Sequence, residues 1–502
     1  MSTNESITDK VSKSAAALAA RQVFSFGISL TGGVLLARIL TPEEFGIYAI
    51  VAFFFGFIKL FGDIGLAPSL VRQEHEPTQK EYSAIFTVQQ IMILASVIVF
   101  WIIAPWLVKI YGIAEIYKWL FRIVALALVL VSFMVIPQVQ LERAIVFQKI
   151  AFVEVIQGVA FNVVAVSLAW YGFGAFSLGW GMIAHTLAGV ILINIINPWH
   201  LTLNFDFKIV KEHLNFGLPF QATRIVSNIN AALNPVLIGL LFGMTSTGYI
   251  EWAIIIIGYL QKPLFLMRRV LFPSFSKLRK NKIKLTEAVN YIYVLSGFIF
   301  FGLVALLVGL APDIVNIIYT NKWIAALPIL YLLIIAAAFN PMSITNHALA
   351  DALGWAKTIL YVNVVRCLFF WLAAYIAITI TGSFLAYGYA LILAEFLQIV
   401  IYYLLKKELP NLQIINGQGI FVASAAGTII FIKLLAKHFI INGFFSLAVA
   451  LIVGGAVYIA FILLLYKIYK RLMTENIIGH TFIFVRNRFQ NKISVGMKTE
   501  KS

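Results

Sequence analysis

The stretch YSAIFTVQQIMILASVIVFWIIAPWLV, residues 82–108, decides the fold class of this sequence. It carries no charged side chain along its whole length, and charged or polar residues flank it. An α-helix rises about 1.5 Å per residue, so about 20 apolar residues cross a bilayer core of about 30 Å. The stretch is therefore long enough for one membrane-spanning helix.

The same pattern recurs along the chain. Of its 502 residues, 61% are hydrophobic and 12% are charged, whereas soluble domains are about 45–50% apolar and about 25% charged. We therefore predict an all-α polytopic membrane protein. Hydrophobic windows place fourteen spans, near residues 17–40, 45–70, 82–108, 118–137, 150–171, 175–196, 214–242, 247–272, 290–312, 324–348, 357–379, 384–405, 416–437 and 443–466.

The net charge of +17 is spread unevenly over the loops. With the N-terminus inside, the inner loops collect most basic residues, including the dense runs 262–284 and 467–501, while the outer turns 171–174, 243–248 and 380–383 carry no charge. This asymmetry follows the positive-inside rule, which predicts a cell-membrane protein with both termini cytoplasmic. Basic loops beside anionic membrane lipids explain the net charge without nucleic acid as a partner.

A weak internal repeat appears when the chain is shifted by 202 residues. The shift pairs Gly46 with Gly248 and Gly56 with Gly258. Because it covers six spans, an even number, the two copies have the same orientation, and substrates of such two-lobed chains commonly bind near the lobe interface. The predicted domains are a first six-helix lobe at 1–213, a second at 214–410, a C-terminal helix pair at 411–468 and a basic cytoplasmic tail at 469–502.

Several function classes lack their sequence signals. There is no GxxxxGK[ST] run to bind ATP, and the seven histidines and the single cysteine show no metal-ligand spacing. We therefore expect neither a metal nor another cofactor. A membrane glycosyltransferase or polymerase would need a large outer catalytic loop, which the short loops do not provide, so this alternative is the least favoured and no enzyme is predicted.

Charged residues inside the predicted spans are candidate functional groups, since such residues usually face a bundle interior or a water-filled cavity. Lys59 and Asp63 are four residues apart and share one helix face. They could form a self-paired scaffold or a cavity wall, and both interpretations stay open. Arg366 and Glu395 lie at comparable depth in consecutive spans, which favours a structural ion pair.

Arg21 and Arg224 lie one position out of register under the 202-residue shift, each near the start of the first helix of its lobe. The segment QATRIVSNINAALNP (221–235) adds Asn228, Asn230 and Asn234 to Arg224. A guanidinium and amides suit a phosphate and sugar hydroxyls. Hydrogen bonding between helices and anchoring at the inner leaflet remain as the alternative roles.

Four stretches, in this order along the chain, carry a family resemblance. They are LARILTPEEFGIYAI (36–50), FGDIGLAPSLVRQ (61–73), FGLPFQATRIVSNINAALNPVLIGLLFG (216–243) and RRVLFPSFSKLR (268–279). Together they resemble the Wzx-type polysaccharide flippases of the multidrug/oligosaccharidyl-lipid/polysaccharide (MOP) exporter superfamily, and are most similar to the colanic and teichuronic acid exporters.

The resemblance implies two six-helix lobes around a central cavity that opens alternately to each side. It implies movement of a polyprenyl-diphosphate-linked oligosaccharide from the inner to the outer leaflet. Without an ATP site, energy must come from a gradient, with Na⁺ or H⁺ as the candidate coupling ion, or from the substrate's own imbalance. Similar proteins often carry an acidic residue at the position of Asn234. The main alternative is a cation-coupled multidrug exporter of the same superfamily, which needs a buried carboxylate.

Overall fold

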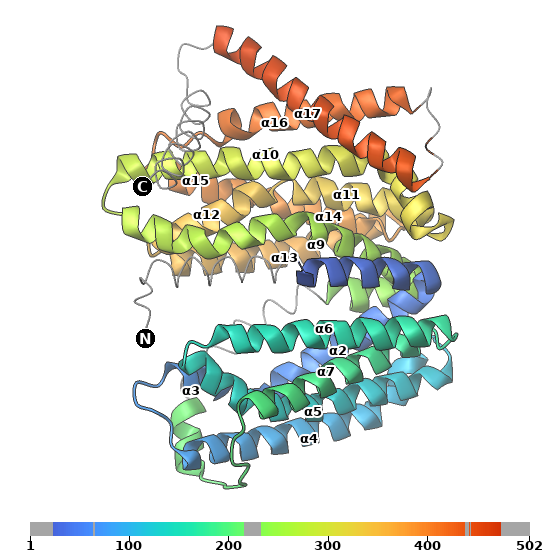
Figure 1. The fold of residues 1–502 in the computed structure, drawn as a ribbon, viewed down its shortest axis with the longest axis vertical. Coiled ribbons are helices and arrows are strands. Elements are labelled where there is room, and N and C mark those ends of the chain that lie inside the picture. The colour runs from blue at the N-terminus through green and yellow to red at the C-terminus, as the bar shows by residue number, and fades with distance from the viewer. Residues whose placement is uncertain (1–23, 64–65, 215–231, 437–440, 442, 473–502) are drawn as a thin grey trace, which may run out of the picture. The chain divides into compact units, whose positions relative to one another are not determined.

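The computed structural model describes residues 24–63, 66–214, 232–436, 441 and 443–472, and the regular secondary structure in these ranges is helical, with no strand (Figure 1). Contacts between Cα atoms divide the chain into two compact units, Met1–Trp252 and Ala253–Ser502. The two units are described separately below.

The first unit is a bundle in which α6 packs along α7, α5 packs against both α4 and α7, and α2 contacts α4, α5 and α7. Aromatic and aliphatic side chains from these helices, among them Ile50, Phe100 and Phe121, form its buried core. Its elements are a helix at Phe24–Ile39, α2 (Pro42–Asp63), α3 (Leu66–Arg72), α4 (Gln79–Ile110), η1 (Glu115–Tyr117), α5 (Lys118–Arg143), α6 (Phe147–Trp170), α7 (Ala175–Ile196), η2 (Leu233–Ile238) and the first part of α9 (Gly239–Leu278).

The sequence fixes where two of these helices begin. At α2 the backbone N–H of Thr41 donates to Glu44 Oε2 at 2.7 Å, and Pro42 occupies the first helical position. At α4 the backbone N–H of Thr78 donates to Glu81 Oε2 at 2.6 Å, and the Thr78 hydroxyl accepts from the Glu81 N–H in return. Both arrangements satisfy backbone donors that the first helical turn leaves unpaired.

The second unit is built around α10, which packs against α16, α17 and α12, while α13 packs along α14. Its core includes Leu285, Val289 and Tyr293 of α10 and Leu405 of α15. The elements are the rest of α9, α10 (Lys282–Ile314), η3 (Val315–Tyr319), η4 (Asn321–Ala326), α11 (Leu327–Ala337), α12 (Asn340–Ala352), α13 (Ala356–Thr381), α14 (Ala386–Glu395), α15 (Gln398–Glu408), α16 (Ile414–Leu435) and α17 (Phe444–Leu472).

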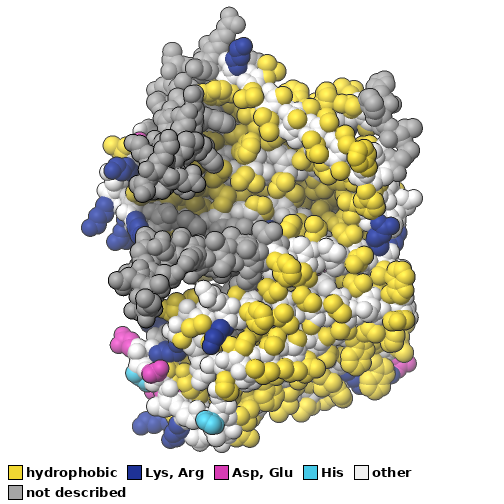
Figure 2. Space-filling model, viewed as in Figure 1, with side chains coloured by type: hydrophobic (Ala, Val, Ile, Leu, Met, Phe, Trp, Pro, Cys, Tyr) yellow, Lys and Arg dark blue, Asp and Glu magenta, His cyan; other side chains and the backbone are white. Residues whose placement is uncertain are grey.

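Eleven helical stretches in the described part of the chain are long and apolar enough to cross a membrane. On the face shown in Figure 2, hydrophobic side chains cover much of the first unit, and charged side chains gather near the end that carries α3. The prediction of an all-α, multi-pass membrane protein is confirmed. Most of the predicted span 214–242 lies outside the described residues.

Some spans differ in detail from the prediction, because hydropathy reports composition and not backbone continuity. The predicted span 324–348 consists of two helices, α11 and α12, and the span 384–405 breaks at Phe396 and Leu397 between α14 and α15. The predicted turn 243–248 shrinks to one residue. Gly243 has φ 79° and ψ −179°, a conformation that only glycine adopts readily, and the helix resumes at Met244.

Two glycines that the 202-residue shift pairs meet in space. A Cβ added to Gly46 of α2 would lie 1.9 Å from the carbonyl oxygen of Met244, and one added to Gly248 would lie 1.8 Å from that of Pro42. The contact is symmetric. Each glycine approaches the carbonyl oxygen of the residue four positions before the other glycine, and these two residues, Pro42 and Met244, are also 202 residues apart. Both segments belong to the first unit, and only glycine permits this backbone approach.

The long helices α4 and α10 also correspond. They have 32 and 33 residues, and they follow N-caps at Thr78 and Asn281, whose side chains each accept the backbone N–H of the residue three positions on. These correspondences support a repeat, while the predicted lobe boundaries at 213 and 410 stay predictions.

Candidate functional site

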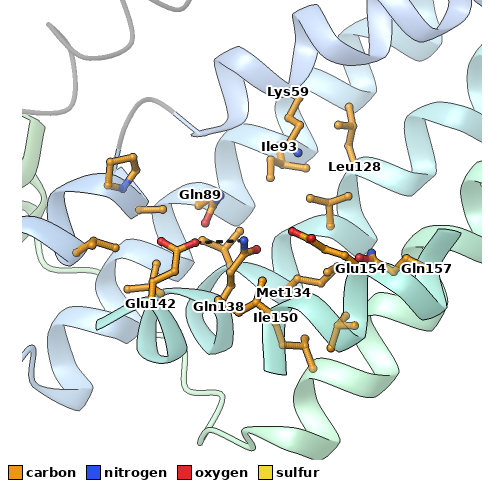
Figure 3. Close-up of a pocket in the computed structure, with 18 of the residues that line it drawn as sticks. Lys59, Gln89, Ile93, Leu128, Met134, Gln138, Glu142, Ile150, Glu154 and Gln157 are labelled. Carbon is orange, nitrogen blue, oxygen red and sulfur yellow. Dashed lines mark hydrogen bonds between the residues drawn. The ribbon is translucent and has the colours of Figure 1, made fainter. Parts of the chain in front are cut away.

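A cavity of about 880 Å³ lies among α2 to α7 of the first unit (Figure 3). We call it the amide pocket, because three glutamine side chains line it. Its polar wall consists of Lys59, Arg72, Gln89, Gln138, Glu142, Glu154, Gln157 and His185.

Helix periodicity explains how the polar groups reach the pocket. Gln138 and Glu142 are one turn apart near the end of α5, and Gln138 Nε2 donates to Glu142 Oε1 at 3.3 Å. Glu154 and Gln157 are three residues apart on α6, so they share a face. Figure 3 shows Gln138 and Glu142 on one side of the pocket, with Gln89 near them, and Glu154 and Gln157 on the other side.

Two of the amides are buried with hydrogen-bonding capacity to spare. Gln89 is 3% exposed, and its Oε1 has no hydrogen-bond partner among the described residues. Gln157 is 5% exposed, and its Nε2 donates to Met134 Sδ at 3.7 Å, a weak acceptor. Gly189 of α7 leaves room for this amide, because a Cβ there would lie 2.1 Å from Nε2. Buried polar groups are normally satisfied, so these amides are suited to a polar ligand.

The charges around the amide pocket balance. Lys59 and Arg72 contribute two positive charges, and Glu142 and Glu154 contribute two negative charges. With His185 neutral, the lining has no net charge. The pocket therefore offers hydrogen-bond donors and acceptors without selecting for an anion or a cation.

A second polar site surrounds Asn234 in η2, a short π-helical segment. Asn234 is 2% exposed, its Nδ2 donates to Glu251 Oε2 of α9 at 3.4 Å, and its Oδ1 has no hydrogen-bond partner among the described residues. Tyr48 of α2 is near enough to Glu251 for an electrostatic interaction. The sequence interpretation missed Glu251 as a candidate site residue, although an acidic residue inside the span 247–272 was a signal.

A third polar site joins α13 to the break after α14. Arg366 Nη1 donates to Glu395 Oε1 at 2.7 Å, and the two side chains are only 26% and 12% exposed. Glu395 is the last residue of α14, and nearby His347 of α12 is 3.2 Å from Gln398 Oε1 at the start of α15. The structure thus brings the predicted partners together, and the structural role of the pair stays a prediction.

The remaining sequence candidates are placed less completely. Lys59 lines the amide pocket, in line with the cavity-wall interpretation, whereas Asp63 is the last residue of α2 and its side chain is not described. Asn234 does not line the same pocket. Four further candidates lie outside the described residues, namely Arg21, Arg224, Asn228 and Asn230.

Membrane-spanning helices around a polar internal pocket define the class of this protein, since charged and amide side chains at this depth are typical of carriers that move a polar solute across a bilayer. The family pattern described as polysaccharide biosynthesis protein matches residues 35–328, more than half of the chain. The chain belongs to this family.

Relatives with curated names support the assignment. The chain is 23% identical over 433 residues to the teichuronic acid biosynthesis protein TuaB of Bacillus subtilis, which covers 83% of this chain and 86% of that protein. It is 26% identical over 369 residues to the succinoglycan biosynthesis transport protein ExoT of Rhizobium meliloti, and this match covers 72% of this chain and 71% of that protein. It is 23% identical over 340 residues to the lipopolysaccharide biosynthesis protein WzxC of Escherichia coli, covering 65% and 67%.

Solved structures show the same fold. The lipid II flippase MurJ in an inward closed conformation matches with a TM-score of 0.71 and 17% identity, covering 89% of this chain and 98% of that one. An inward-facing multidrug resistance MATE family transporter of the MOP superfamily matches with a TM-score of 0.61 and 16% identity. This match covers 78% of this chain and 95% of that one. The expected all-α, multi-pass fold is confirmed.

Proposed function

We propose that this protein is a flippase that moves a polyprenyl-diphosphate-linked oligosaccharide, the repeat unit of a surface polysaccharide, from the inner to the outer leaflet by alternating access. The family and the names of the relatives support a role in polysaccharide export. The observation that carries the proposal is the amide pocket, a partly open cavity in the helix bundle whose apolar wall carries amide groups and charged side chains with formal charges that cancel. In this proposal the lobes 1–213 and 214–410 move against each other, and the helix pair 411–468 flanks the second lobe.

Both termini lie in the cytoplasm in this proposal. Exposed aromatic side chains gather where α4 and α6 end and where α5 begins, as in Trp106, Trp119 and Trp170, and aromatic belts mark membrane interfaces. Among the described basic residues of the first unit, six lie at the other helix ends, namely Arg72, Lys80, Arg143, Lys149, Lys208 and Lys211, and four lie at the aromatic ends, namely Arg38, Lys109, Lys118 and Arg122. Reporters fused after Gly172 should be outside the cell, and those fused after Lys280 should be inside. An outside signal after Lys280 would reverse the orientation.

The substrate's diphosphate binds Arg224 and, less strongly, Arg21, with Asn228 and Asn230 beside Arg224. Bidentate, charge-assisted hydrogen bonds from a guanidinium to a phosphate are the physical reason. Arg224→Glu should abolish flipping in a protein of normal abundance, and Arg224→Lys should retain a fraction. Wild-type flipping by an abundant Arg224→Glu protein would contradict this assignment.

Energy comes from a gradient of H⁺ or Na⁺ or from the substrate's own imbalance. Where similar proteins often carry an acidic residue, this chain has Asn234, and Glu251 supplies a carboxylate to its amide. Glu251 is therefore the candidate group for the coupling ion, because a carboxylate can bind either ion.

The alternative, a multidrug exporter for organic cations, fits the amide pocket less well, because such a ligand favours a net negative lining. Deletion of the gene separates the two functions. Loss of a flippase leaves lipid-linked oligosaccharide on the inner leaflet and does not change sensitivity to cationic dyes. Dye sensitivity with a normal surface glycan would favour the exporter.

A further inference from the structure

We propose that the amide pocket is a carbohydrate subsite, which holds sugar rings of the lipid-linked oligosaccharide while the diphosphate binds elsewhere. The inference rests on the proposed function and adds to it a site for the glycan inside the first unit. Gln89 and Gln157 are its central groups, with Gln138 and Glu142 beside Gln89 (Figure 3).

The buried amides indicate the type of hydrogen bonds that the ligand must make. The acceptor Oε1 of Gln89 lacks a donor among the described residues, and the Gln157 amide donates to a thioether. A primary amide offers an acceptor and two donors, and a hydroxyl group offers one donor and two acceptors. Neighbouring sugar hydroxyls can therefore satisfy these amides once the buried Gln89 amide rotates toward the ligand, and a purely apolar ligand would leave them unsatisfied inside the bundle at a cost in free energy.

The formal charges of the lining disfavour the charged parts of a lipid-linked substrate. A diphosphate in a lining with two basic and two acidic residues would remain uncompensated, and so would an organic cation. Burying an uncompensated charge is far more costly than burying a hydrogen-bonded neutral group. Uncharged sugar rings of the oligosaccharide are the part of the substrate that matches this lining.

The apolar part of the wall and the volume agree with this assignment. Ile93, Leu128 and Ile150 line the pocket among the amides, so C–H faces of a sugar ring meet aliphatic side chains while its hydroxyls meet the amides. The volume of about 880 Å³ lies within the range of about 300–1,000 Å³ for small-molecule sites.

The test is equilibrium binding to the purified, detergent-solubilised full chain. The probe is the oligosaccharide released by mild acid from the polyprenyl diphosphate of cells that make this protein. We expect Gln89→Leu and Gln157→Leu each to weaken its binding about tenfold, since 1.4 kcal/mol corresponds to a factor of ten and the loss of a buried hydrogen bond is of this size. The matched control is Gln418→Leu in α16, a buried amide of the second unit that donates to the Tyr293 carbonyl at 3.4 Å.

Melting temperatures separate binding from folding. Replacing Gln89 by the similar-sized Leu removes an unsatisfied polar group, so the melting temperature should stay or rise, whereas Gln418→Leu should lower it without changing glycan binding. A lowered melting temperature with unchanged glycan binding for both pocket variants would show that the amides have a structural role only.

Two further probes, inorganic pyrophosphate and tetraphenylphosphonium, test the ligand class. Binding of either probe that depends on Gln89 would overturn the inference, and so would wild-type glycan affinity in both pocket variants. Flipping of the intact lipid-linked substrate in proteoliposomes is measured separately. Glycan binding that needs Gln89, with no flipping by the wild type, would refute the proposed flippase and retain the subsite. Wild-type flipping and glycan binding in the Gln89→Leu and Gln157→Leu proteins would refute the subsite and retain the flippase.

Discussion

Alanine at Gly46 or Gly248 places a methyl group against the backbone of the neighbouring helix. The added Cβ would lie 1.9 Å from the Met244 oxygen in the first case and 1.8 Å from the Pro42 oxygen in the second, whereas ordinary contacts of this kind are 3.4–4 Å. The helices must therefore separate locally by about 1.5 Å. Overpacking costs about 1–3 kcal/mol, and the upper end applies because a backbone oxygen cannot rotate away.

Glycines further along the same helices serve as matched controls. Gly56 of α2 and Gly258 of α9 are also 202 residues apart, and a Cβ at either one meets nothing within 4 Å. There, alanine should stabilise by about 0.5–1 kcal/mol, because glycine loses more conformational freedom in a helix. Gly32 is a second control, since its added Cβ would meet the Asn162 side chain at 1.6 Å, which can move to another rotamer.

Thermal unfolding of the purified protein and flipping in proteoliposomes measure the effect. Gly46→Ala and Gly248→Ala should lower the melting temperature by about 5 °C, Gly32→Ala by less, and the two open-space controls should leave it unchanged or raise it. A loss of about 2.8 kcal/mol also lowers the population of this conformation about a hundredfold against one in which the helices are apart, so flipping should fall. Equal melting temperatures and flipping rates for Gly46→Ala and Gly56→Ala would refute this reasoning.

Three further outcomes are expected. Arg366→Ala and Glu395→Ala should each reduce stability by about 3 kcal/mol, since either change leaves a largely buried charge unpaired. Exchanging the two residues should restore part of the protein level. Normal protein levels with lost transport would instead place the pair in the substrate path. Glu251→Gln should keep its melting temperature but lose stimulation of flipping by an H⁺ or Na⁺ gradient, and retained stimulation would exclude Glu251 as the coupling group. Burial lowers the pKa of His213, which lies next to Ser69 and outside the spans, below its ordinary 6.5, so folding favours the neutral ring. The contribution of His213 to stability should be complete above pH 6.5 and should decline as pH falls through the lowered pKa. His213→Asn should therefore flatten the dependence of the melting temperature on pH between about pH 7.5 and 5, and an unchanged slope would exclude His213 as its source.

Features that depend on composition and spacing could be predicted from the sequence, and features that depend on side-chain contacts could not. Hydropathy located the helices, and the depth of Arg366 and Glu395 in consecutive spans suggested their pairing. Gln89 lies in the strongly apolar helix Gln79–Ile110 and was not predicted as a site residue, because an uncharged amide hardly changes a hydropathy window. Gln89 is a candidate site residue because it is buried in a pocket that α5 and α6 also line. This burial depends on how the helices pack, which the sequence alone does not reveal. Glu251 was visible as a charge, but its contact with Asn234 depends on where α9 bends.

The lengths of the helices have a consequence for the bilayer in which this protein works. At 1.5 Å per residue, α4 and α10 are each about 48–50 Å long, and α7, with 22 residues, is about 33 Å long. The helix α7, like α2 and α16 with 22 residues each, is close to a hydrocarbon thickness of about 30 Å, whereas the longer helices must tilt or extend into the headgroup layer. Their capped, polar first turns, at Thr78 and Asn281, suit the headgroup layer. Hydrophobic mismatch then acts mainly on the short helices such as α7. Because α7 lines the amide pocket, lipids with longer or shorter acyl chains would strain the bundle at this pocket.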